Sequence, residues 1–233
     1  MTRAAILALA LGAPVAALAG RPMVTDDARL AERGACQVET WIRGERHATE
    51  AWALPACNPT GNLELAFGGA RTFEGGTSRF TDHVVQAKTL LHALSDEHWG
   101  LGLTLGASRQ PARESAHGWP GDAYFDLPLS VAVLRDEQWV AHFNAGAIRK
   151  RDTATTVVTW AFGNEVRLHD DLTLVPEVYR SEPGRPFVQA GLRYKMAEGR
   201  VQLSGSIGGR LRGNPDERWF SLGVSVYPRP FLP

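Results

Sequence analysis

The stretch FDLPLSVAVL, residues 125–134, decides the fold. Its large apolar side chains stand at every second position, at Phe125, Leu127, Leu129, Val131 and Val133. Aspartate, proline, serine and alanine occupy the positions between them. Because side chains alternate between the two faces of a strand, this period of two predicts a β-strand with one apolar and one polar face.

The same alternation recurs along the chain and predicts an all-β protein of about twelve strands. The predicted strands cover residues 35–43, 47–56, 62–72, 83–93, 99–108, 123–134, 139–148, 155–167, 172–180, 186–196, 201–211 and 217–227. Most are about ten residues long, which exceeds the roughly five to six residues typical of soluble proteins and suits a tilted transmembrane strand. We therefore expect a closed antiparallel up-and-down transmembrane β-barrel over residues 34–233.

The connections between these strands differ in length in the way that outer-membrane barrels require. Tight, charged turns are expected on the periplasmic side at residues 95–98, 135–138, 169–171 and 197–200. Longer outer loops are expected at residues 74–82 and 110–122. Within the second, Arg113–Trp119 is the stretch long enough to gate a channel or bind a ligand. The inner connection at residues 55–62 is longer than the other inner turns.

Residues 1–19 have the layout of a secretory signal peptide. Arg3 provides a short positive region, an apolar run follows, and Ala17–Ala19 is a small-x-small cleavage site. We expect Gly20 to be the first mature residue, and a retained N-terminal anchor is the alternative. The formal net charge of the whole chain is zero. This argues against nucleic acid as a partner, because nucleic-acid binding needs a basic face.

Two cysteines, Cys36 and Cys57, stand at the start of the first predicted strand and the end of the second. If that hairpin turns near Arg46 and His47, the cysteines face each other across neighbouring strands. An exported protein meets an oxidising compartment, so we predict one disulfide, with two free thiols as the alternative. No metal site or cofactor is expected, because the sequence has no second cysteine pair and no histidines at ligand spacing.

The polar faces of the predicted strands carry charges of both signs. The candidates for a lumen wall or solute path are Glu39, Glu64, Lys88, Asp126, Glu165, Glu177, Arg193, Lys195 and Arg210. A barrel in lipid turns these faces inward and a soluble barrel turns them to water, yet the alternation is the same in both. The abundance of glycine, alanine and serine on the polar faces suits a crowded lumen and favours the membrane barrel.

Aromatic residues near the strand ends also favour the membrane barrel, since tryptophan and tyrosine mark membrane interfaces. We expect such a girdle from Trp41, Trp52, Phe73, Trp99, Trp119, Tyr124, Trp139, Tyr179, Phe187, Tyr194, Trp219 and Tyr227. The chain also ends in an alternating strand followed by Phe231, an arrangement similar to the terminal signal that the barrel-assembly machinery reads.

The segment RPMVTDDA follows the leader directly, from Arg21. Thr25, Asp26 and Asp27 can accept backbone hydrogen bonds and form a tight turn, and the arginine can pair with one of the carboxylates. Residues 20–33 are therefore expected to form a periplasmic segment that caps the lumen. A solvated tail is the alternative.

This segment resembles the start of the meta-pathway phenol-degradation family, in which an Arg-Pro-x-x-Thr-Asp-Asp run precedes a glycine and a first strand with an acidic residue. The matching residues are Arg21, Pro22, Thr25, Asp26, Asp27, Gly34 and Glu39. The resemblance implies an outer-membrane β-barrel and suggests a link to the uptake of aromatic compounds.

Together these features predict a protein of the outer membrane that contacts outer-membrane lipid and the barrel-assembly machinery. Twelve strands enclose a narrow lumen, because open porins use about 16–18 strands. Charges of opposite sign on facing walls are expected to pair with one another. We expect a narrow channel or uptake protein for small-molecule solutes, aromatic compounds among them, rather than an enzyme.

Two alternatives remain at this stage. One is a soluble secreted β-barrel that binds a ligand. The other is an outer-membrane lipid-modifying enzyme in which Ser130, His142 and Asn144 form a catalytic set on the polar faces of two adjacent strands.

Overall fold

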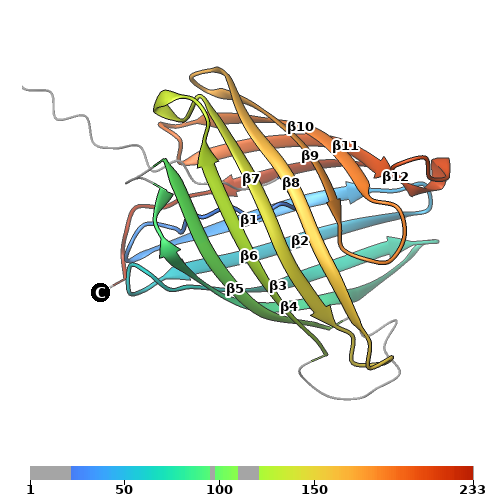
Figure 1. Ribbon diagram of the computed structural model, residues 1–233. Coiled ribbons are helices and arrows are strands. Elements are labelled where there is room, and N and C mark those ends of the chain that lie inside the picture. The colour runs from blue at the N-terminus through green and yellow to red at the C-terminus, as the bar shows by residue number, and fades with distance from the viewer. Residues whose placement is uncertain (1–21, 95–97, 110–120, 233) are drawn as a thin grey trace, which may run out of the picture.

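The computed structural model describes residues 22–94, 98–109 and 121–232, which form a closed antiparallel barrel of twelve strands (Figure 1). The strands are β1 (Ala35–Gly44), β2 (Ala48–Asn58), β3 (Glu64–Glu74), β4 (Thr77–His92), β5 (Trp99–Arg109), β6 (Asp122–Ala132), β7 (Trp139–Arg149), β8 (Thr156–His169), β9 (Leu172–Arg180), β10 (Phe187–Met196), β11 (Val201–Arg210) and β12 (Arg218–Val226). Two short 3-10 helices, η1 (Arg135–Glu137) and η2 (Pro215–Glu217), lie in connections. The predicted fold class and strand number are confirmed.

Each strand pairs with its neighbours in sequence, and β1 closes the barrel on β12. The closing register runs from Val38 opposite Val226 to Gly44 opposite Phe220. Closure leaves no sheet edge unpaired, which is the condition for a β-structure in a bilayer. The predicted leader at residues 1–19 and the stretch Arg113–Trp119 lie outside the described residues.

The expected outer loop at residues 74–82 is wrong, because β3 and β4 continue through most of it. The hairpin turns at Gly75 and Gly76, whose φ angles are 56° and 79°. Glycine adopts such positive φ angles without a steric penalty, so a two-residue turn suffices. Strand pairing then extends up to Glu74 opposite Thr77.

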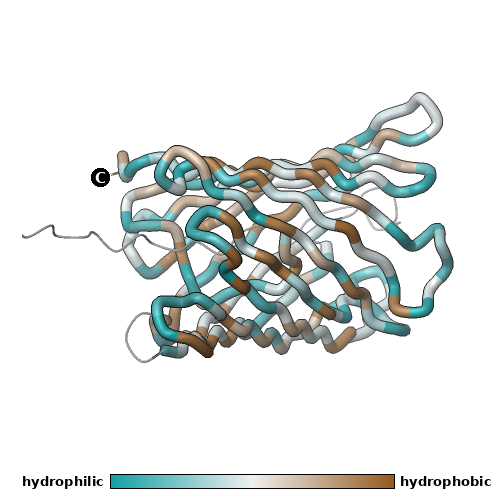
Figure 2. The backbone as a smooth tube through the Cα atoms, turned by 90° about the horizontal axis from the view of Figure 1, so that it is seen from above, coloured by the Kyte–Doolittle hydropathy of each residue, from teal (hydrophilic) through white to brown (hydrophobic). Residues whose placement is uncertain are grey.

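The outer surface of the barrel is apolar. Large apolar side chains that stand exposed in the strands include Phe67, Leu105, Leu192, Ile207 and Leu222. In Figure 2, hydrophobic and hydrophilic residues alternate along the strands. An apolar band of this kind around a closed barrel is the surface that lipid tails require. Among the residues that the structure describes, no helix is long and apolar enough to cross a membrane.

The expected aromatic girdle is only partly correct. Phe73, Trp139 and Tyr194 are exposed on the outer surface. The barrel interior takes Trp41, Trp52, Tyr124, Tyr179, Phe187 and Trp219. A position near a strand end predicts how deep an aromatic ring lies along the barrel axis. It does not predict whether the ring points inward or outward, because side chains alternate between the two faces of a strand.

These inward aromatic residues pack against one another. The rings of Trp41 and Trp52, which are opposite each other in β1 and β2, stack with centroids 5.2 Å apart. The ring of Phe187 lies 5.4 Å from that of Tyr179 and 5.6 Å from that of Trp219. They therefore fill the lumen beside β9, β10, β12, β1 and β2.

The start and end of the barrel are tied together at one rim. Cys36 and Cys57 are opposite each other in β1 and β2 and form a disulfide, as predicted. The backbone N–H groups of Phe231 and Leu232 both donate to the carbonyl of Gly34, at 2.9 and 2.8 Å. These bonds fix the point at which the chain leaves the lumen and enters β1.

Replacing Leu222 by arginine tests the outer surface. Leu222 lies at the middle of β12 with its side chain exposed. In a bilayer the substitution is expected to lower the free energy of unfolding by about 2–4 kcal/mol, because a guanidinium group would face hydrocarbon. Urea titration of the protein folded in phospholipid vesicles measures this change. Thr153→Arg, in an exposed turn, is the control, and equally small effects of both substitutions would contradict a lipid-facing surface.

Candidate functional site: the lumen and its N-terminal segment

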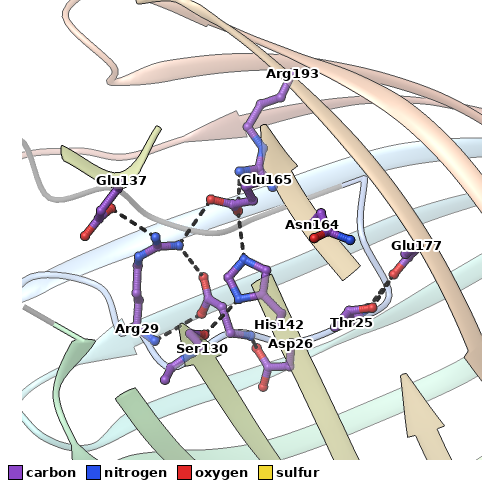
Figure 3. A network of polar contacts seen from close by, with 12 residues as sticks. Thr25, Asp26, Arg29, Ser130, Glu137, His142, Asn164, Glu165, Glu177 and Arg193 are labelled. Atoms are coloured by element: carbon purple, nitrogen blue, oxygen red, sulfur yellow. Dashed lines mark hydrogen bonds and ion pairs between the residues drawn. The ribbon is translucent and has the colours of Figure 1, made fainter. Parts of the chain in front are cut away.

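Residues 22–33, called here the lumen segment, run inside the barrel before β1 begins. Asp27 and Ala28 are 2% and 1% exposed, although both precede the first strand. Side chains from strands between β2 and β10 bind the segment, as Figure 3 shows for part of the network. The walls therefore hold the segment along its length.

One end of the lumen segment is bound by Glu177 of β9. Its carboxylate accepts hydrogen bonds from the backbone N–H of Val24 at 2.9 Å, the N–H of Thr25 at 2.8 Å and the Thr25 hydroxyl at 2.6 Å. The amide of Gln189 in β10 donates to Glu177 at 3.0 Å and also to the carbonyl of Pro22. Hydrogen bonds to a charged acceptor are roughly twice as strong as neutral ones, so this is a firm attachment.

Asp26 is held through both its side chain and its backbone. Lys88 Nζ lies 2.7 Å from Asp26 Oδ1 and 3.2 Å from Asp27 Oδ1, and the Thr104 hydroxyl donates to Asp26 Oδ2 at 3.1 Å. The side-chain amide of Asn144 accepts from the Asp26 N–H at 2.8 Å and donates to the Asp26 carbonyl at 3.1 Å. This two-way amide pairing resembles one rung of a β-ladder and fixes the segment in register with the wall.

Arg29 is the arginine of the lumen segment that lies among carboxylates. Its guanidinium is 3.3 Å from both Asp27 and Glu165 and 3.0 Å from Glu137. Glu165 also pairs with Arg193 of β10 at 2.7 Å. Burial opposes the charge on Arg29, but Glu165, Asp27 and Glu137 outweigh this and raise the pKa of the guanidinium. The network thus supplies the pairing that buried charges need.

Ser130 and His142, which are opposite each other in β6 and β7, form a buried hydrogen bond. Ser130 Oγ lies 2.8 Å from His142 Nδ1, and both residues are 0% exposed. The backbone N–H of Ala28 donates to the same serine oxygen at 2.8 Å, and His142 Nε2 lies 3.9 Å from Glu165. Asn144 does not join this pair, because it binds Asp26. The serine oxygen is therefore covered by the lumen segment.

The segment leaves the lumen beside β2 and β3. The N–H of Ala31 donates to Glu64 at 2.8 Å, and the side-chain amide of Asn58 donates to the Ala31 carbonyl at 2.6 Å. Asn58 ends β2 and Glu64 begins β3, and the Gly34 N–H donates to the Asn58 carbonyl at 2.8 Å, so both bonds lie beside the point where the chain enters β1.

Glycines in the walls make room for the lumen segment. A Cβ atom placed on Gly163 would lie 2.5 Å from Met23 Cε and 2.9 Å from Thr25 Oγ1. A Cβ atom on Gly191 would lie 2.6 Å from Pro22 Cγ. Side chains at either position would meet the segment, so the wall is shaped to its path.

The structure brings most of the predicted lumen residues together. Glu64, Lys88, Glu165 and Glu177 contact the lumen segment directly, and Arg193 contacts it through Glu165. Glu39 and Asp126 line the cavity described below, and Lys195 is half-buried in β10. Of the N-terminal motif, Pro22, Thr25, Asp26 and Asp27 belong to the segment, and Arg21 lies outside the described residues.

Arg210 is not brought together with the others. At the loop end of β11 its guanidinium pairs with Glu182 and Glu217 and lies 4.2 Å from the ring centre of Phe187. A hydrogen bond from the backbone of Asn214 and the pairing with Arg210 lower the pKa of Glu217. Arg210 thus anchors connecting loops.

Several residues of the network were missed by the sequence reasoning. Arg29, Thr104 and Gln189 take part in it. Alternation does place Thr104 and Gln189 on the polar faces of their strands. Arg29 precedes the first strand, so no alternation assigns it to a face, and only the position of the segment inside the barrel reveals its role.

A cavity of about 390 Å³ runs beside the lumen segment, from Gln37 and Glu64 near the rim where β1 begins to Ser108 near the loop ends. Its walls include Tyr124, Asp126, Ile148 and Tyr179, and Asp26 of the lumen segment borders it. Within the described part of the chain, no group of three or more His, Cys, Asp or Glu side chains is arranged to hold a metal ion.

A family model described as "Uncharacterised conserved protein UCP029691" matches residues 6–227. The chain belongs to this family. No curated protein sequence matches the chain.

Solved structures with a similar fold are outer-membrane barrels. The KdgM porin in complex with disordered oligogalacturonate is 10% identical, with a TM-score of 0.61, and the match covers 82% of this chain and 98% of that one. The NanC porin is 13% identical, with a TM-score of 0.57 and coverage of 82% and 99%. An outer membrane channel from Pseudomonas putida F1 is 12% identical, with a TM-score of 0.54 and coverage of 86% and 98%. The shared fold and the apolar outer surface identify an outer-membrane β-barrel.

Replacing Lys88 by methionine tests how the lumen segment is held. The substitution removes the cation shared by Asp26 and Asp27 and leaves buried carboxylates without it. We expect faster hydrogen exchange at the amides of residues 24–28, because the free energy of opening the segment should fall by about 3–5 kcal/mol. Mass spectrometry of the folded barrel measures the exchange.

The matched control adds Asp26→Asn and Asp27→Asn to the same variant. Removing both charges is expected to restore much of the protection. Unchanged exchange in Lys88→Met alone would contradict an attachment through this ion pair.

Proposed function

We propose that the protein is an outer-membrane channel for small solutes and that the lumen segment closes it. The observation that carries this proposal is the lumen segment itself, which lies buried inside the barrel and borders the cavity of about 390 Å³. A solute entering from the loop ends would meet the segment at Asp26. Passage then requires the segment to move.

The way in which the segment is attached supports a closure that can be released. It is bound by hydrogen bonds and ion pairs rather than by a disulfide, and its buried apolar residues are Pro22, Met23, Ala28 and Ala31. When the segment moves out, the segment and the wall groups that bound it can both exchange these bonds for bonds to water, which makes release reversible. Twelve strands enclose too little space for a wide water channel beside the segment.

The surroundings of the barrel support an outer-membrane site of action. The exposed apolar side chains fit outer-membrane lipid, and Phe231 near the C-terminus fits recognition by the barrel-assembly machinery. The fold shared with the KdgM and NanC porins supports passage of solutes through the lumen. The resemblance of the N-terminal motif to the phenol-degradation family stays a prediction, and it makes aromatic compounds the first solutes to test.

The proposal assigns no catalytic role to Ser130 and His142. Both are fully buried, and the Ala28 N–H is bonded to the serine oxygen, so a substrate has no path to it while the segment is in place. The pair instead serves as a hydrogen-bonded support for the lumen segment. A Ser130→Ala variant that opens more often than the wild type, because Ala28 loses its acceptor, and that leaves the lipid composition unchanged would fit this assignment.

Conductance of Glu177→Gln in planar bilayers tests the proposed closure. The substitution removes the charged acceptor of the bonds from Val24 and Thr25. We expect the free energy that favours the closed state to fall by about 2 kcal/mol, which would raise the ratio of open to closed channels roughly 30-fold. Single-channel recordings measure this ratio.

Glu217→Gln is the matched control, since Glu217 pairs with Arg210 far from the segment and its loss should leave gating unchanged. A second variant replaces residues 22–33 by a glycine–serine chain and is expected to be open constantly. Wild-type closure that persists in both lumen variants would contradict the proposal.

A further inference from the structure

On one wall of the cavity beside the lumen segment, two side chains lie flat over glycines and so leave the volume free. Tyr124 lies along the barrel wall over Gly106, where any Cβ atom would meet the tyrosine ring. Asp126 lies over Gly146, where a Cβ atom would be 2.7 Å from its carboxylate oxygen. The Tyr124 hydroxyl donates to Gln86 at 3.0 Å and fixes the ring in this position. Both side chains are thus held against the wall beside the open volume.

The opposite side of the cavity is apolar and aromatic. Tyr179 of β9 and Leu54 of β2 line it, whereas Ile148 of β7 adds an apolar surface directly beside Tyr124 of β6. Tyr179 is itself supported by stacking on Phe187. A volume of about 390 Å³ falls within the range of small-molecule sites. The cavity can therefore take a ring-sized body with an apolar surface.

The charges around the cavity are unequal. Its described lining contains five carboxylates and three basic groups. The carboxylates are Asp26, Asp27, Glu39, Glu64 and Asp126, and the basic groups are Arg29, Lys88 and Arg180. The lining therefore contains more acidic than basic groups.

Lys88 of the wall and Arg29 of the lumen segment are already paired with carboxylates. Lys88 pairs with Asp26 and Asp27, and Arg29 pairs with Asp27, Glu137 and Glu165, as the site geometry shows. In the described part of the chain, the carboxylate of Asp126 has no ion-pair partner. A half-buried carboxylate without a cation is costly, and a ligand that supplies the cation removes that cost.

We propose that this cavity binds a small organic cation, an amine on an aromatic or apolar body. The ammonium group lies toward Asp126 and Asp26, and the body lies between Tyr124, Ile148 and Tyr179. Aromatic faces also attract cations directly. An anionic solute of the same shape meets the carboxylates and is disfavoured. This inference rests on the proposed function, since it names the solute class that the lumen accepts from the loop end.

Equilibrium binding of three probes with one ring and different charge tests the inference. The probes are 2-phenylethylamine, 2-phenylethanol and phenylacetate, added to the detergent-folded protein in a titration calorimeter. The amine is expected to bind at least tenfold more tightly than the alcohol, and phenylacetate more weakly still. Phenylacetate binding as tightly as the amine would overturn the inference with wild-type protein alone.

Asp126→Asn then identifies the site. It keeps the shape of the side chain and is expected to weaken amine binding about tenfold, while leaving binding of the alcohol unchanged. Asp152→Asn removes a carboxylate from an exposed turn and serves as the matched control. Equal amine affinity in the wild type and Asp126→Asn would place the amine elsewhere and overturn the inference.

Binding in detergent needs no conduction, so the two proposals fail separately. A barrel that binds the amine but never conducts would refute the channel and keep the cation site. A barrel that conducts but does not prefer the amine would refute the cation site alone.

Discussion

The structure depends on one constraint: a closed barrel in lipid must turn its apolar faces outward and enclose its charges. In a lumen of twelve strands these charges are buried, and buried charges are unfavourable unless they are paired. The lumen segment supplies the missing partners. Asp26 and Asp27 meet Lys88, and Arg29 meets Glu165, so that segment and wall neutralise each other.

The same constraint explains how space is distributed in the lumen. Large aromatic residues fill the side formed by β9, β10, β12, β1 and β2, whereas glycines at 106 and 146 leave the side beside β6 open. The remaining cavity runs beside the segment and carries Asp126 without a paired cation. The inward side chains thus decide which side of the lumen is filled, where the segment binds, and why the cavity has more acidic than basic groups.

The strands could be predicted from the sequence because the alternation of apolar and polar residues is a local property. This alternation predicted all twelve strands and placed Cys36 opposite Cys57. The direction of the aromatic residues could not, since proximity to a strand end says nothing about the face on which Trp41 or Trp219 lies. The site was predicted in part. Glu177 and Lys88 were identified as inward charges, but their partners lie in a segment about 150 and 60 residues away, and no local pattern encodes such distances.

The most direct test of a lumen closed by its own N-terminal segment is a reversible cross-link between Thr25→Cys and Gly163→Cys. A Cβ atom on Gly163 would lie 3.0 Å from Thr25 Cβ, closer than the roughly 3.5–4.5 Å found in disulfides, so the segment and the flexible end of Met23 must shift slightly to admit the bridge. The account predicts that this disulfide forms in the folded barrel, that conductance is suppressed while it is intact, and that a reductant restores it. The same reductant should leave wild-type conductance unchanged. Cysteines that stay reduced, or an oxidised protein that conducts as well as the reduced one, would contradict the account.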